Sequence, residues 1–164
     1  MLGTSGESFG MRIRIVVADQ AEARFYDMHL PEKSLRPSGR LLDPSARLHE
    51  RDLVSDRPGR VFDRAPMPAT RRGAMAHHDT GGERSARRYA AMAFARRIVQ
   101  QLDLARRQGR FERVVLMANP RFLGMLRRVL PPRLGECVAA AVPKDLVHQG
   151  ERAVRAHLPE DALR

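Results

Sequence analysis

The feature that most constrains the fold is a helical pattern of apolar side chains between residues 83 and 108. Apolar residues recur there every three to four positions, and pairs of arginines occupy the other face; the apolar positions are Ala86, Ala90, Phe94, Ile98, Leu102 and Ala105. This spacing places them along one stripe of an amphipathic helix. Gly109 follows and indicates where the helix ends. Because such a stripe must be covered by another layer of structure, the helix is expected to pack on a sheet.

Strand and helix patterns alternate after this helix. A buried strand is predicted from Phe111 to Ala118, and Asn119 with Pro120 indicates the start of a second helix that runs through Arg128. A last strand over residues 135–142 and a helix from about 146 to 158 complete the series. This alternation favours parallel strands joined by right-handed crossovers.

The N-terminal part of the chain favours antiparallel strands. Residues 12–19 are β-branched and apolar, and a turn at 19–20 leads to a second strand over 23–28 that can pair as a hairpin. Residues 30–44 are rich in Pro, Ser and Gly and predict a loop, and residues 47–53 alternate like a third, edge strand. The predicted fold class is α/β: a mixed sheet of an antiparallel three-strand meander plus two parallel strands, with packed helices. This order resembles the ribonuclease-H-like topology of the middle domain of archaeal and eukaryotic class-1 release factors.

One domain is expected from a chain of 164 residues. Residues 1–10 are predicted to be a flexible N-terminal extension, which leaves Met1 and Met11 as alternative starts. Residues 11–158 form a single α/β domain with a long mobile loop at about 54–82, and residues 159–164 form a C-terminal tail. The first ten residues lack the features of a secretion signal, and no stretch approaches ~18 consecutive apolar residues, so a cytoplasmic protein without a membrane span is expected.

Positive charge is concentrated in the middle of the chain. The net charge is +11, and residues 57–128 hold 17 arginines against five acidic residues. One interpretation is a solvated surface that reflects codon usage, and the other is a face that meets a polyanion. Arginine suits the second interpretation because its planar fork of donors matches phosphate oxygens.

Two short segments are candidate anion sites. A tight turn over residues 56–59 would present two arginines to an anion, and two adjacent glycines before the long helix would let backbone N–H groups approach one. The alternatives are a turn that tethers a loop and a hinge with a helix cap. The candidate anion-binding or nucleic-acid-binding residues are Arg57, Arg60, Gly81, Gly82, Arg84, Arg87 and Arg88.

Motifs for catalysis and metal binding are sparse. His77, His78 and Asp79 could ligate a metal, but no second cluster with ligand spacing accompanies them, so no metal and no cofactor is expected. Asp19 at the end of the first strand lacks the converging acids that two-metal nucleases require. Cys137 has no disulfide partner and is predicted to lie in the core.

The sequence resembles the bacterial host attachment protein family, also described as proteins required for attachment to host cells. The resemblance lies in the opening hairpin and in four later segments: 16–19 with 23–25, then 56–62, 109–118, 119–127 and 142–146. Their order and spacing agree over most of residues 11–158.

That family is similar in turn to the release-factor middle domain, whose signature is Gly-Gly-Gln leading into Ser-Ala-x-Arg-aromatic-Ala. The corresponding run here extends from Gly81 to Ala90, with Glu83 in place of the glutamine and one extra residue before Ser85. Because the glutamine helps to place water at the peptidyl ester, the resemblance implies a related fold without peptide release.

Three functions follow as hypotheses. The leading one is a non-enzymatic cytoplasmic protein that binds RNA or the ribosome through Arg57, Arg60, Arg84, Arg87 and Arg88. The second is a hydrolase of an ester or tRNA conjugate, with Glu83 and a neighbouring histidine as acid and base. The third is an adhesion-related interaction protein, as the family description suggests.

Overall fold

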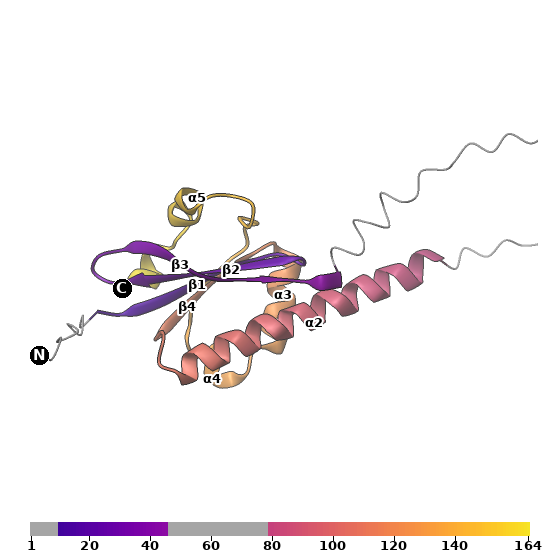
Figure 1. The fold of residues 1–164 in the computed structure, drawn as a ribbon, viewed down its shortest axis with the longest axis horizontal. Coiled ribbons are helices and arrows are strands. Elements are labelled where there is room, and N and C mark those ends of the chain that lie inside the picture. The colour runs from indigo at the N-terminus through magenta and orange to yellow at the C-terminus, as the bar shows by residue number, and fades with distance from the viewer. Residues whose placement is uncertain (1–9, 46–78) are drawn as a thin grey trace, which may run out of the picture.

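The computed structural model describes residues 10–45 and 79–164, and in them five strands form one mixed sheet (Figure 1). The order across the sheet is β3-β2-β1-β4-β5. β2 is antiparallel to β1 and β3, whereas β4 is parallel to β1 and β5. The strands are β1 (Arg12–Ala18), β2 (Glu22–His29), β3 (Ser34–Leu42), β4 (Arg113–Ala118) and β5 (Val138–Val142). The predicted mixed α/β sheet, a three-strand meander plus two parallel strands, is confirmed.

The first hairpin forms where the sequence predicts it. The carboxylate of Asp19 accepts hydrogen bonds from the backbone N–H groups of Ala21 and Glu22, both at 2.7 Å. An aspartate that bonds the backbone two and three residues ahead closes a tight turn. This turn sets the register in which Val16 pairs with Phe25.

The third strand differs from the prediction. β3 covers residues 34–42, within the segment predicted to be a loop, and the strand predicted at 47–53 lies outside the described residues. Pro37 and Gly39 pair with Tyr26 and Phe25 across a register shift. The loop prediction was wrong because it rested on the Pro, Ser and Gly content of this segment. Proline and glycine are tolerated on an edge strand at a bulge, and here β2 supplies the hydrogen-bonding partner.

Helices cover both faces of the sheet (Figure 1). α2 (Asp79–Arg107), α3 (Pro120–Val129) and α4 (Pro132–Gly135) lie on one face, and α5 (Glu151–Ala156) and the 3₁₀ helix η1 (Glu160–Leu163) lie on the other. The long helix ends before Gly109, whose φ of +66° suits glycine. The C-terminal helix is shorter than predicted because a turn over residues 147–149 and Gly150 precede it. η1 lies within the predicted tail, and its Ala162 is buried.

Two apolar cores lie on opposite faces of the sheet. β1 and β4 are buried almost throughout and contribute alternate side chains to each core. Val16 and Leu116 join Phe94 and Phe122 under α2 and α3. Val17 and Met117, with the neighbouring strand residues, join Leu146 and Val154 on the other face. Strands that are covered on both faces have nearly continuous runs of apolar residues. This pattern is why the sequence predicted β1 and β4.

Candidate nucleic-acid interface

The first turns of α2 extend beyond the sheet. Every described side chain from residue 81 to residue 89 is exposed, and burial on α2 begins at Ala91 (Figure 1). Residues 81–89 are called the α2 tip below. The apolar stripe weakens here to Ala86 and Ala90, and the described residues provide no layer against which Ala86 packs. The helix therefore carries its N-terminal part into solvent.

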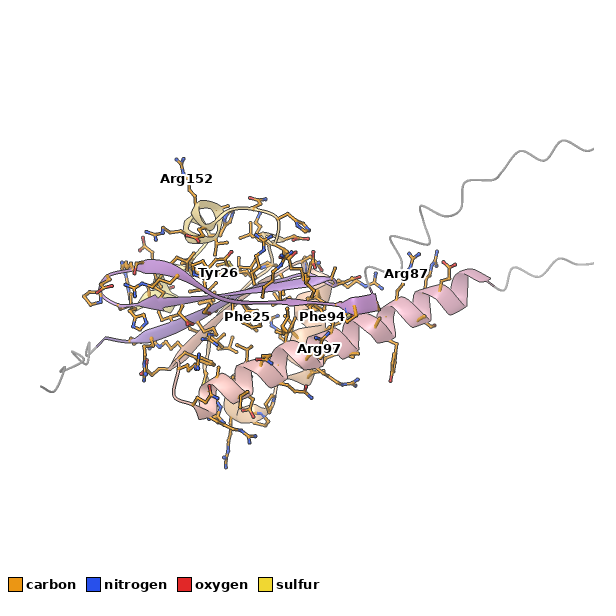
Figure 2. The ribbon with its side chains drawn as sticks, viewed as in Figure 1. Phe25, Tyr26, Arg87, Phe94, Arg97 and Arg152 are labelled. Atoms are coloured by element: carbon orange, nitrogen blue, oxygen red, sulfur yellow. The ribbon has the colours of Figure 1, made fainter. Side chains whose placement is uncertain are left out.

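Three predicted anion-binding arginines lie on the α2 tip. Arg84, Arg87 and Arg88 are all exposed, and Tyr89 beside them is 73% exposed. In Figure 2, Arg87 points outward from the tip, whereas Phe94 and Arg97 lie further along the helix, beside the sheet. The α2 tip is therefore a projecting stretch of helix that carries three cations and one aromatic ring, and a polyanion can approach it from several sides.

The predicted loop before the helix is corrected at its C-terminal end. Gly81 and Gly82 lie in the first turn of α2, which begins at Asp79. Glycine costs about 1 kcal/mol in a helix interior, but the sequence prediction overstated its effect at a helix start. The first four N–H groups of a helix have no intrahelical acceptor, and the helix dipole adds partial positive charge there. Both glycines therefore still lie among the donors that favour an anion.

Glu83 is placed on the same exposed surface. Its Oε2 lies 3.6 Å from an Nη of Arg87, one helical turn later, and both side chains are more than half exposed. The neighbouring His77 and His78, like Arg57 and Arg60, lie outside the described residues. The described geometry therefore gives Glu83 an ion pair with a cation and no arranged acid–base partner.

A groove between α2 and α3 joins Arg88, which the sequence predicted, to four arginines that it did not predict. Two hollows, of about 690 Å³ and 260 Å³, share Arg128 in their lining. Together these hollows form what is called the α2–α3 groove below. The arginines along it are Arg88, Arg96, Arg107, Arg121 and Arg128. The only signal for the other four in the sequence is the excess of arginine in the central segment, because α2 and α3 meet only in the folded chain.

Ion pairing separates the arginines of the sheet from those of the groove. Glu22 is buried and accepts hydrogen bonds from Arg24 at 2.6 Å and Arg40 at 2.9 Å. Burial opposes ionisation of this carboxyl, but the bonds from Arg40 and Arg24 outweigh it and hold the pKa of Glu22 below its ordinary value. Arg14 pairs with Asp27 through two bonds of 2.8 and 3.0 Å.

The groove is not neutralised in the same way. Asp103 is the one carboxylate that lines it among the described residues, and this carboxylate already pairs with Arg106 at 3.3 Å and Arg107 at 2.7 Å. Within residues 10–45 and 79–164, Arg96, Arg121 and Arg128 take part in no ion pair. The face that carries α2 and α3 therefore combines an exposed helix tip with a groove in which Arg96, Arg121 and Arg128 pair with no described carboxylate.

The remaining candidate residues form no further site. His148 lies 3.4 Å from Asp19 at the carboxyl end of β1, but no three His, Cys, Asp or Glu side chains of the described chain gather as metal ligands. Cys137 lies just before β5, packs against the α2-side core, and its thiol donates to the carbonyl of Arg133 at 3.5 Å. None of the helices in the described ranges has the length and apolarity needed to cross a bilayer.

Comparison with known proteins identifies the family. A solved structure described as an archaeal protein is similar over 92% of this chain, with 14% identity and a TM-score of 0.41, and this chain spans 36% of that structure's length. The comparison with curated proteins found no match. The sequence model of the family described as "Protein required for attachment to host cells" matches residues 14–158, which include the α2 tip, the groove and all of the sheet except the first two residues of β1. The chain therefore belongs to the family of proteins required for attachment to host cells.

Proposed function

We propose that this protein binds RNA, including RNA of the ribosome, through the arginines of the α2 tip, and that it acts in the cytoplasm without catalysing a reaction. The observation that carries the proposal is the projection of the tip, whose residues 81–89 are exposed on every side. Its arginines can reach phosphates without moving any core residue. Phosphate contacts of this kind supply most of the affinity in sequence-independent nucleic-acid binding.

Two further observations support this function. The run from Gly81 to Ala90, which resembles the release-factor signature, coincides with the tip and its first anchored turn. The strand order, with only β2 reversed, supports the predicted ribonuclease-H-like and release-factor middle-domain relationship. That relationship is a proposal, and under it the tip corresponds to the release-factor signature.

A non-enzymatic role is supported by the surroundings of Glu83. An efficient general acid or base needs a partner or substrate held within hydrogen-bond reach. Glu83 is more than half exposed, and its ion pair is with Arg87. We therefore assign Glu83 to the electrostatics of the helix tip.

The experiment is a salt titration of RNA binding by the full chain and by Arg84→Gln/Arg87→Gln. We expect affinity for a structured RNA to fall steeply with salt, and the double variant to lose about two units of the log–log salt slope, about one for each phosphate contact removed. Both side chains are exposed, so the melting temperature of the variant should equal that of the parent.

The matched control is Arg152→Gln/Arg155→Gln. These two exposed arginines lie on α5, on the opposite face of the sheet, and their removal changes the net charge equally (Figure 2). RNA binding that weakens equally in both double variants would show a diffuse charge effect and reject the tip as the contact. Absence of binding by the parent protein at low salt would reject the function itself.

A further inference from the structure

The smaller hollow of the α2–α3 groove is lined by three arginines, two methionines and a glycine. It has a volume of about 260 Å³ and is lined by Arg88 and Met92 of α2 and by Arg121, Gly124, Met125 and Arg128 of α3. On α3 the spacing of residues 121, 124, 125 and 128 places them on one side of the helix. A Cβ added at Gly124 would meet no atom within 4 Å, so the glycine leaves the floor of the hollow open.

The larger hollow has a different lining. Its volume of about 690 Å³ lies within the range of small-molecule sites, which is about 300–1,000 Å³. Val99, Leu104, Val129 and Pro131 supply apolar surface, and Leu104 is 51% exposed although it is a large aliphatic side chain. Gln100, at the same hollow, offers an amide that can both donate and accept a hydrogen bond.

We propose that the α2–α3 groove binds a nucleoside phosphate, with the phosphate among Arg88, Arg121 and Arg128 and the base against Val99 and Leu104. Arginine forks match phosphate oxygens, and a base offers a flat apolar face together with hydrogen-bonding edges. Neither hollow alone provides both features, but Arg128 joins the two. The same chemistry can come from a free mononucleotide or from the 5′-phosphorylated end of an RNA strand.

The charge of the groove favours this class of ligand. The lining of the smaller hollow includes no carboxylate among the described residues, and Asp103 of the larger hollow is already paired. Three nearby cations without a counter-charge repel one another, and an anion that binds between them relieves this repulsion. Because such a ligand binds the folded chain, it should raise the melting temperature in proportion to the logarithm of its concentration.

The experiment is thermal unfolding and calorimetric titration of the full chain with AMP, adenosine and inorganic phosphate. We expect AMP to raise the melting temperature and to bind at least about tenfold more tightly than either fragment, because only AMP occupies both hollows. Adenosine that binds as tightly as AMP would show that the arginines do not hold a phosphate. No binding of AMP, together with no preference for a 5′-phosphorylated RNA, would overturn the proposal.

Variants distinguish loss of AMP binding at the groove from loss of stability and from effects of the α2 tip. Arg121→Gln/Arg128→Gln should lose at least about tenfold in affinity for AMP, whereas Arg84→Gln/Arg87→Gln and Arg152→Gln/Arg155→Gln should retain it. Gly124→Leu should also abolish AMP binding by filling the smaller hollow, with no loss of melting temperature, since the added Cβ has open space. Retained AMP affinity in both groove variants would overturn the site.

The source of the phosphate is decided by an RNA arm. A short RNA with a 5′-phosphate is compared with the same RNA carrying a 5′-hydroxyl, in the parent and in Arg121→Gln/Arg128→Gln. If the 5′-phosphorylated RNA binds more tightly than both the 5′-hydroxyl RNA and AMP, the ligand is an RNA end. Equal affinities for the two RNAs, with AMP still bound, identify a free nucleotide. AMP binding by a parent protein that binds no RNA at low salt would leave the groove standing although the proposed function fails.

Discussion

At the scale of single residues, the partner of an arginine decides its role. The Arg14 side chain is almost fully buried, pairs with Asp27 and lies 5.5 Å from the centre of the Phe111 ring. Arg121 and Arg128 have the same side chain, but they face a groove and take part in no ion pair with a described residue. Arginine in the sheet therefore stabilises the fold, whereas arginine in the groove is available to a ligand.

The ion cluster at Glu22 predicts a pH-dependent contribution to stability. We expect Glu22→Gln to lower the free energy of unfolding at pH 7 by about 1–3 kcal/mol, because a buried carboxylate that holds Arg24 and Arg40 is lost. The pKa of Glu22 is lowered from 4.5 in the folded chain, so its stabilisation is complete above that value and disappears as the pH falls through the folded pKa. Urea unfolding at several pH values should show the difference between parent and variant shrinking below pH 4.5.

Glu112→Gln is the matched control for this cluster. Glu112 pairs with Arg12, but both side chains are nearly half exposed, so solvent screens the pair. Its loss should cost less than about 1 kcal/mol. A Glu22→Gln deficit that stays constant from neutral pH to pH 3, or that only equals the deficit of Glu112→Gln, would contradict the assignment.

At the scale of elements, the helices that the sequence predicted begin and end at residues whose own side chain or backbone conformation marks the boundary. Asn119 caps α3: its Oδ1 accepts a hydrogen bond from the backbone N–H of Phe122 at 2.9 Å, and Pro120 opens the helix. Gly109 terminates the long helix with a positive φ. β3 shows the opposite case, because its proline and glycine are accommodated only through pairing with β2.

The cap at Asn119 gives a prediction for α3. Asn119→Ala removes the side-chain acceptor and should lower the free energy of unfolding by about 1 kcal/mol, measured by urea denaturation. Asn119→Asp keeps an acceptor and adds negative charge at a helix N-terminus, so its stability should equal or exceed that of the parent. An unchanged free energy of unfolding in Asn119→Ala would show that the cap contributes nothing.

At the scale of the whole molecule, the positive charge is distributed unequally over the faces of the fold. Buried and partly buried ion pairs neutralise arginines in the sheet, whereas the helix face carries the α2 tip and the groove. The net charge of +11 at pH 7 increases as the 19 acidic residues and six histidines take up protons. Mutual repulsion therefore grows as the pH falls.

This charge predicts how salt affects stability. In about 1 M NaCl the screening length falls to about 3 Å, so salt should raise the melting temperature more at pH 4 than at pH 7. Arg96→Gln/Arg128→Gln removes two of the unneutralised groove charges and should reduce the gain at pH 4. Differential scanning calorimetry measures both effects, and an equal gain at the two pH values would contradict the prediction.

The sequence by itself determined the elements whose signals are local. The apolar stripe of α2 beyond its exposed tip, its end at Gly109, the buried run of β4 and the cap of α3 depend on residues close together in the chain, and these lie where predicted. The excess of arginine in the central segment is also a property of the sequence, and the assignment of Arg84, Arg87 and Arg88 to anion binding stays a prediction. Only the tertiary structure decided the rest, because it depends on residues distant in the chain. Glu22 pairs with Arg40, which lies 18 residues away in the chain. Pairing with β2 makes the proline-containing segment 34–42 a strand. The packing of α2 on α3 places Arg88, Arg121 and Arg128 at the same hollow.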